Sequence, residues 1–251
     1  MKTIQSVSIM LAAVFFLTVS VQVHAASMDS RIESSAMKSY VFKTYLKNDD
    51  IKIMSKDGAV TLTGVVSVNS HKVLAQETVS GLPGVKSIDN RLEIKGAAPS
   101  ANSDAWLVDK VKATLLFHRS VSAASTEVNV KDGFVTLRGN AATQAQKELT
   151  TEYTKDVEGV KDVTNEMTIA KVSKQKRTVG KKIDDASITS LVKIELLYHR
   201  STSAINTSIT TKKGIVTVTG KAKNTAEKDL VTKLANDVNG VKKVINKMII
   251  E

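Results

Sequence analysis

Cysteine is absent from the 251 residues of this chain. The absence excludes a disulfide framework, a thiolate metal site and a lipid anchor attached to a cysteine. Any folded unit must therefore be stabilised by its apolar core and its hydrogen bonds alone.

Long apolar runs are missing after the first 25 residues. Lys2 gives a short basic start, residues 4–23 are uncharged and mostly apolar, and small residues precede Ala26. This pattern predicts a cleaved signal peptide over 1–25, so that the mature chain is exported and soluble. The alternative is an uncleaved anchor, because the uncharged run approaches bilayer-spanning length.

Constellations that carry catalysis are missing too. No nucleophile stands beside a base, no histidines and acidic residues have metal-ligand spacing, and no glycine-rich run with a lysine follows a predicted strand. We therefore expect a chain that is not an enzyme and that holds no cofactor and no metal.

A repeated pattern of glycines, aliphatic residues and an asparagine is what the chain does contain. Residues 57–64 reappear as 132–139 and 213–220, and the copies are offset by 75 and then 81 residues. We interpret the recurring residues as structural. They are Gly58, Gly64, Gly84, Asn90, Gly133, Gly139, Gly159, Asn165, Gly214, Gly220, Gly240 and Asn246.

The fixed register predicts three tandem modules rather than one large domain. They span residues 29–94, 104–169 and 185–250, and a basic linker over 170–184 precedes the third. Modules of this size have small cores and modest stability.

Each module is predicted to follow the order α-β-β-α-β. In the second module, Leu107, Val111 and Leu115 recur at helical spacing, and Asp132-Gly133 separates two alternating runs as in a tight hairpin. The strand that follows the second helix favours a right-handed parallel crossover. The fold class is thus α+β, each module a three-stranded mixed sheet with two helices on one face.

The second helix of each module is expected to turn one stripe to the core and to end at a glycine. In the second module the stripe is Leu149, Tyr153 and Val157, and Gly159 ends the helix in a left-handed conformation.

The signature Asp-Gly-x-Val-x-Leu-x-Gly, followed by Gly-Val-x-x-Val-x-Asn-x-Leu, resembles the BON domain (bacterial osmotically inducible and nodulation protein domain). The second module shows it as Asp132-Gly133, Val135, Leu137, Gly139, Gly159-Val160, Val163, Asn165 and Met167. The resemblance covers nearly all of the chain after the leader except the linkers. It implies the fold above, residence in the bacterial periplasm, roles in envelope or osmotic stress, contact with phospholipid membranes and no catalytic chemistry. Three modules are a departure, since secreted members more often carry two.

The net charge of +11 is concentrated toward the C-terminal end. The first module has 9 basic and 8 acidic residues and the second has 8 and 10, whereas the third has 11 and 5. The linker has 6 basic residues and 1 acidic residue. For an exported protein, this balance favours an anionic membrane surface or a polysaccharide over nucleic acid.

The candidate anion-binding residues therefore lie in the linker and the third module, where a solvated spacer is the alternative. Near an anionic bilayer each basic residue contributes on the order of 1 kcal/mol. The candidates are Lys171, Lys174, Lys176, Arg177, Lys181, Lys182, Lys221, Lys223, Lys242 and Lys243, continued by Lys212 and Lys213.

Trp106 is the single tryptophan and occupies the third position of a predicted helix. Its indole is a candidate for insertion at a membrane interface, and ordinary partial burial is the alternative.

Two further polar patterns recur. His118-Arg119-Ser120 and His199-Arg200-Ser201 end the first helix in two modules, which is favourable to the helix dipole, with a repeated anion or metal site as the alternative. Asn90 and its equivalents Asn165 and Asn246 are expected to make a side-chain hydrogen bond that fixes a bend or closes a helix end, rather than to bind a ligand.

Two functions follow as hypotheses. The first is a non-enzymatic periplasmic protein of envelope or osmotic stress that binds anionic phospholipid surfaces reversibly. The second is a chaperone-like or protein-interaction module for envelope proteins, with avidity from repetition. The sequence leaves open the oligomeric state and whether the modules pack together.

Overall fold

The structure is a computed structural model that describes residues 28–96, 99–121, 123–170, 182–202 and 207–251. The predicted signal peptide and most of the basic linker lie outside these residues. Among the described helices, none is long and apolar enough to cross a membrane.

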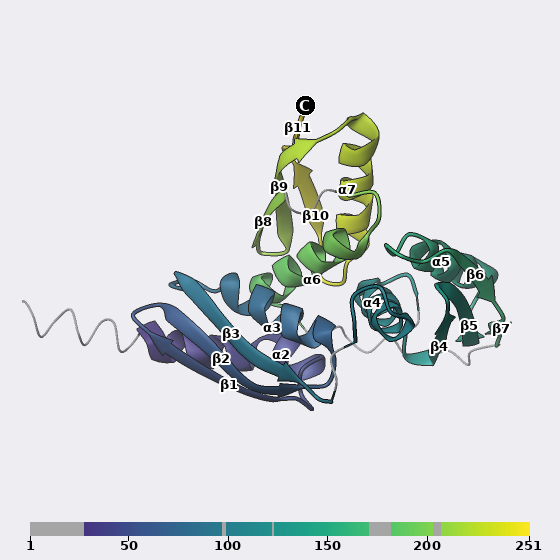
Figure 1. The fold of residues 1–251 in the computed structure, drawn as a ribbon. Coiled ribbons are helices and arrows are strands. Elements are labelled where there is room, and N and C mark those ends of the chain that lie inside the picture. The colour runs from purple at the N-terminus through teal and green to yellow at the C-terminus, as the bar shows by residue number, and fades with distance from the viewer. Residues whose placement is uncertain (1–27, 97–98, 122, 171–181, 203–206) are drawn as a thin grey trace, which may run out of the picture.

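The three modules have the predicted element order (Figure 1). The first contains a helix over residues 28–38, α2 (Tyr40–Thr44), β1 (Asp50–Lys56), β2 (Ala59–Val66), α3 (Asn69–Ser80) and β3 (Ser87–Ile94). The second contains α4 (Asp104–Phe117), η1 (Ala123–Ser125), β4 (Thr126–Lys131), β5 (Phe134–Ala141), α5 (Gln144–Lys155), β6 (Asp162–Asn165) and β7 (Thr168–Ile169). The third contains α6 (Asp185–Tyr198), β8 (Thr207–Lys212), β9 (Ile215–Ala222), α7 (Thr225–Asp237), β10 (Lys243–Asn246) and β11 (Ile249–Ile250).

The sheet topology confirms the predicted fold class. In each module the two hairpin strands are antiparallel, as in β1 and β2, and the strand after the second helix pairs in parallel with the second hairpin strand. Because both helices cover one face, the other face of each sheet is turned outward, and helices α3, α4 and α6 meet at the centre of the molecule (Figure 1).

An aspartate on the first helix holds the hairpin turn of every module. Asp104 accepts hydrogen bonds from the backbone nitrogens of Asp132 (2.8 Å) and Gly133 (3.0 Å), and Asp29 and Asp185 repeat the arrangement. The turn residue before the glycine has φ near 50°, a left-handed conformation that aspartate tolerates. In the third module this residue is Lys213, at φ 54°.

The predicted stripe of the second helix is wrong at one of its three positions in the second module. Leu149 is 38% exposed, whereas Thr150 and Thr154 are fully buried. The two threonines satisfy their hydroxyl groups by donating to the carbonyl oxygens four residues earlier, at 2.7 Å each, so a polar side chain can face the core.

The glycine expected to end the second helix lies beyond its end. Helix α5 ends at Lys155, and Gly159 follows in a turn with φ 96°. A Cβ atom at Gly159 would lie 2.8 Å from Leu107 of α4, so the residue is required to be small as well as left-handed.

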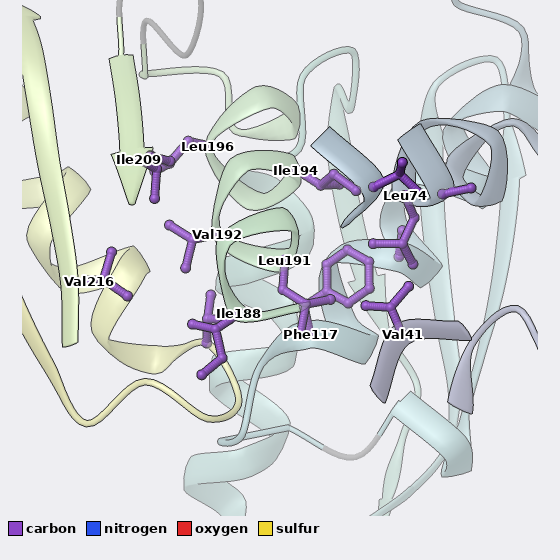
Figure 2. Close-up of a cluster of buried hydrophobic side chains, with 14 of the residues drawn as sticks. Val41, Leu74, Phe117, Ile188, Leu191, Val192, Ile194, Leu196, Ile209 and Val216 are labelled. Carbon is purple, nitrogen blue, oxygen red and sulfur yellow. The ribbon is translucent and has the colours of Figure 1, made fainter. Parts of the chain in front are cut away.

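The modules do not have separate cores, because the first and third share one. Helix α6 buries Ile188, Val192 and Leu196 against its own sheet, and Leu191 and Ile194 on its other side toward the first module (Figure 2). An α-helix with apolar residues on two sides can pack against two neighbours at once. Val41 and Leu74 of the first module and Phe117 of α4 in the second complete this joint core, while most buried residues of the second module form a separate cluster.

Candidate functional site

The predicted basic residues fall into three groups. Lys171, Lys174, Lys176, Arg177 and Lys181 lie outside the described residues. Lys182, Lys242 and Lys243 lie at the hairpin-turn end of the third module, and Lys221 and Lys223 lie at the opposite end of β9. The five described lysines are all exposed.

The outward face of the third sheet carries basic and apolar side chains together. Ile215 pairs with Lys212 on one side and Lys243 on the other, so that two exposed lysines flank an isoleucine that is 39% exposed. One pair further along, Ile245 lies beside Thr217. Lysine at such places keeps its ammonium in water and lays its carbon stem along apolar neighbours.

The far end of the same face repeats the pattern. Lys221 pairs with Ile249, which is 61% exposed, and makes an exposed ion pair of 3.2 Å with Glu251. Lys247 lies exposed between β10 and β11. The sequence signal for this face is the alternation of lysine and isoleucine from 243 to 249, a period of two that the count of charges alone had missed.

The equivalent faces of the other modules are not basic. In the second module, Phe134 takes the place of Ile215 and lies between Lys131 and Asp162. Further along, Arg138 and Glu166 form an exposed ion pair of 2.7 Å. On the outward face of the first sheet, basic and acidic side chains are equal in number. They are Lys52, Lys56, Arg91, Asp50, Asp89 and Glu93.

Trp106 is half-buried against the core of the second module rather than projecting into solvent. The ammonium of Lys110 lies 4.0 Å from the centroid of its ring, a cation–π contact. The indole is thus engaged inside the protein and is separate from the basic face of the third module.

The two His-Arg-Ser segments join the second module to the third. The backbone nitrogen of Arg119 donates to the carbonyl of Asp237 (3.1 Å), and that of Arg200 donates to the carbonyl of Asp156 (2.9 Å). Each guanidinium also donates to carbonyl groups beyond the second helix of the other module. The joint is therefore reciprocal, which explains why the motif occurs in these two modules.

One half of this joint contains a buried ionic cluster. His118 lies between Asp237 (2.9 Å from Nδ1) and Glu195 (3.0 Å from Nε2), and its ring stacks on Tyr153 with centroids 3.8 Å apart. The contact with Glu195 is an ion contact without hydrogen-bond alignment, and Oε2 of Glu195 has no partner among the described residues. Burial lowers the pKa of His118, but the interactions with the carboxylates of Asp237 and Glu195 outweigh it and raise the pKa to about 9.

Asp237 of this cluster also binds the serine of the same segment. Ser120 donates to Asp237 (2.5 Å), so its hydroxyl is not directed at the imidazole. Among the described residues, no group of three or more histidines and acidic residues is placed to hold a metal ion.

The recurring asparagines tie the third strand to the second helix. Asn165 donates from Nδ2 to the carbonyl of Lys147 (2.9 Å) and accepts at Oδ1 from the nitrogen of Met167 (2.9 Å). Asn90 and Asn246 make the same two contacts. With all of its polar atoms engaged, this residue has a structural role.

Comparison with known proteins places this repeated unit. The family description "BON domain" matches residues 28–96, 103–171 and 184–251. The chain belongs to the BON domain family. The matches cover most of the chain, and each contains one of the three α-β-β-α-β modules.

Two curated relatives are similar over more than half of the chain. Osmotically-inducible protein Y of Escherichia coli (strain K12) is 29% identical over 143 residues, 55% of this chain and 71% of that protein. Outer membrane lipoprotein DolP of Haemophilus influenzae is 26% identical over 148 residues, 58% of this chain and 75% of that protein. A solved structure of CdsD, a structural protein of the type III secretion system of Chlamydia trachomatis, is 15% identical over 92% of both chains, with a TM-score of 0.24.

Proposed function

We propose that this BON protein is a non-enzymatic periplasmic protein of osmotic or envelope stress that binds anionic phospholipid surfaces through its third module. The names of its relatives, an osmotically inducible protein and an outer membrane lipoprotein, support the setting. The observation that carries the proposal is the outward face of the third sheet, where Lys212, Lys243 and Lys247 alternate with exposed isoleucines.

The composition of this face suits a membrane surface better than a soluble partner of mixed charge. Ammonium groups are attracted to anionic head groups, while Ile215, Ile245 and Ile249 add apolar area at the depth of the head-group boundary. With each lysine contributing on the order of 1 kcal/mol, the contact is reversible and weakens as salt rises.

The experiment is co-sedimentation of the full chain with vesicles of phosphatidylcholine, alone or mixed with phosphatidylglycerol. We expect binding to the mixed vesicles only, and loss of that binding at high salt. Equal binding to both kinds of vesicle, or no effect of salt, would contradict the proposal.

A charge-reversal variant locates the contact. Lys243→Asp with Lys247→Glu gives the third module the residues that the second has at Asp162 and Glu166, so the substitutions suit the fold. Its control is Lys131→Glu with Arg138→Glu on the equivalent face of the second module. Deleting the third module is a poor test, because its helix α6 completes the core of the first.

A second function, holding unfolded or partner proteins, is favoured by a different observation. Phe134 on the second module is 55% exposed, and Met54 on the first is 68% exposed, both on outward sheet faces. Suppression of client aggregation without lipid, lost in Phe134→Ser and retained in the lysine variant, would support this function.

A further inference from the structure

A hollow of about 840 Å³ lies where the first module meets the third, at the hairpin-turn end of β8 and β9. Its walls include Tyr40 from α2, the approach to α6 at Lys182, the turn at Lys213, and Asn239 and Lys242 after α7. The backbone nitrogen of Tyr40 donates to Asp184 (2.7 Å), which fixes the two modules to each other at this point. The hollow is distinct from the outward sheet face described above.

The two carboxylates at the hollow are already engaged by donors of the protein. Asp184 accepts from the nitrogens of Ser187 (2.9 Å) and Tyr40, and so caps α6. Asp185 accepts from the nitrogens of Lys213 (2.7 Å) and Gly214 (2.8 Å). Each of the four carboxylate oxygens thus has a backbone donor.

The three ammonium groups are not engaged in this way. Among the described residues, no carboxylate lies within ion-pair distance of the side-chain nitrogens of Lys182, Lys213 or Lys242. The stem of Lys242 lies over the turn glycine, with its Cγ and Cδ 3.1 Å from where a Cβ of Gly214 would stand. The hollow therefore gathers three cations, two carboxylates that are fully hydrogen-bonded, and the polar side chains of Tyr40 and Asn239.

The same place in the second module has the opposite charge. Ala101, Asp132, Glu158 and Lys161 stand where the third module has Lys182, Lys213, Asn239 and Lys242. There the ammonium of Lys161 is directed over the ring of Phe134, 5.7 Å from its centroid. Lys182 and Lys213 are thus specific to the third module, whereas Lys242 has a lysine at the equivalent position in the other two modules, Lys86 and Lys161.

We propose that this hollow binds a phosphomonoester group, of the kind carried by a lipid head group or a small soluble phosphate ester. A phosphomonoester carries about −1.5 to −2 charges at pH 7, which matches several lysines better than a single carboxylate would. The volume exceeds that of one phosphate group and leaves room for the alcohol part of the ester. This inference deepens the proposed membrane function by naming a head-group class, and its test separates the two.

The variant that tests the inference is Lys213→Asp. Aspartate stands at this turn position in the other two modules, at φ 53° in Asp57 and 52° in Asp132, so the turn accepts it. The matched control is Lys161→Ala, which removes the cation equivalent to Lys242 from the second module.

Binding is measured on the full chain with phosphatidylcholine vesicles that contain either phosphatidic acid, a phosphomonoester, or phosphatidylglycerol, a diester, at matched surface potential. We expect the unmodified chain to prefer phosphatidic acid by on the order of tenfold, and the substitution Lys213→Asp removes two charge units from the hollow. The variant is expected to bind both vesicles alike, and Lys161→Ala to keep the preference.

A second experiment adds soluble glycerol 3-phosphate to the chain and measures the NMR chemical shifts of the residues around Lys213. Shifts that saturate in the unmodified chain and vanish in Lys213→Asp show that the phosphate ester alone is sufficient, even if no vesicle binds and the membrane proposal fails. Equal affinity for the two anionic vesicles together with no saturable shift overturns the inference while leaving the membrane proposal intact. A preference that persists in Lys213→Asp also overturns it.

Discussion

The second and third modules have the same fold and dock on each other through the same motif, yet their outward faces differ in charge. Asp162 and Glu166 of the second become Lys243 and Lys247 of the third, whereas the buried Val135 and Leu137 remain aliphatic as Val216 and Val218. The core fixes the inward positions of a strand because any change in volume there is destabilising. The outward positions are free to vary, and so they are where the modules differ in charge.

Transplanting charge between the two faces is the strongest test of this comparison. Asp162→Lys with Glu166→Lys, added to the Lys243→Asp and Lys247→Glu variant, moves the basic face to the second module. We expect the affinity for vesicles to fall by a hundredfold or more in the variant with Lys243→Asp and Lys247→Glu alone, since four charge units correspond to about 4 kcal/mol. The affinity is expected to return in the variant with all four substitutions. Binding is measured by co-sedimentation at low salt. A combined variant that stays inactive would show that orientation or the isoleucines, rather than charge, decide the contact.

The cores of the two modules should also respond differently. Leu191→Ala removes a side chain shared by the first and third modules, and we expect it to lower the free energy of unfolding by about 2–5 kcal/mol. Its equivalent in the second module is Lys110, and most buried residues of that module form a separate cluster. Leu107→Ala is the matched change in the second module.

The single tryptophan allows these changes to be told apart. Trp106 fluorescence reports the second module, and far-UV circular dichroism reports all three. We expect Leu107→Ala to displace the Trp106 transition and Leu191→Ala to displace mainly the circular dichroism transition. If both variants move the Trp106 transition equally, the three modules unfold as one unit.

Sequence patterns were sufficient for the fold inside each module and insufficient for the arrangement of modules. Asp-Gly turns and aliphatic alternation are local signals, and they predicted the hairpin and the crossover correctly. Residues such as Leu191 and Ile194 would be apolar whether they packed against their own module or against another. Their spacing in the sequence therefore does not indicate which module they contact. Likewise, His118 has no local signal of its ionic partners, because Glu195 and Asp237 lie 77 and 119 residues further along the chain.

The sequence predicted the sign of the charge at the candidate site but not the arrangement of its side chains. The excess of lysines in the third module located the charge, but only strand pairing shows that Lys212 and Lys243 flank Ile215. The stripe of the second helix failed at Leu149 because Thr150 and Thr154 satisfy their own hydroxyl groups and can be buried. A hydrophobicity scale does not account for such hydrogen bonds between a side chain and the backbone of its own helix.

The joint between the two modules should weaken at alkaline pH. The pKa of His118 is raised from its ordinary value of 6.5 to about 9 by Asp237 and Glu195 against the effect of burial. A raised pKa in the folded state adds stability that is complete below pH 6.5 and is lost as pH rises through 9. The groups around the ring are Glu195 on α6, Asp237 on α7, and Tyr153 on α5.

Thermal unfolding between pH 6 and pH 10 measures this loss. His118→Gln is expected to flatten the decline, while His199→Gln, whose Nε2 lies 3.6 Å from Asp156, is expected to retain it. An unchanged decline in His118→Gln would assign the pH dependence to other groups.

The smallest effect is expected where the two modules are alike. Asn165→Ala and Asn246→Ala each remove the bonds between the third strand and the second helix, with Nδ2 donating to a carbonyl at 2.9 and 2.8 Å. Loss of these bonds and exposure of their partners to water should cost each module about 1–2 kcal/mol. Denaturant titration followed by Trp106 fluorescence and by circular dichroism measures the two losses. Similar values would confirm that the asparagine is a shared structural device, whereas a larger loss of vesicle binding than of stability in Asn246→Ala would show that it also shapes the basic face through Lys247.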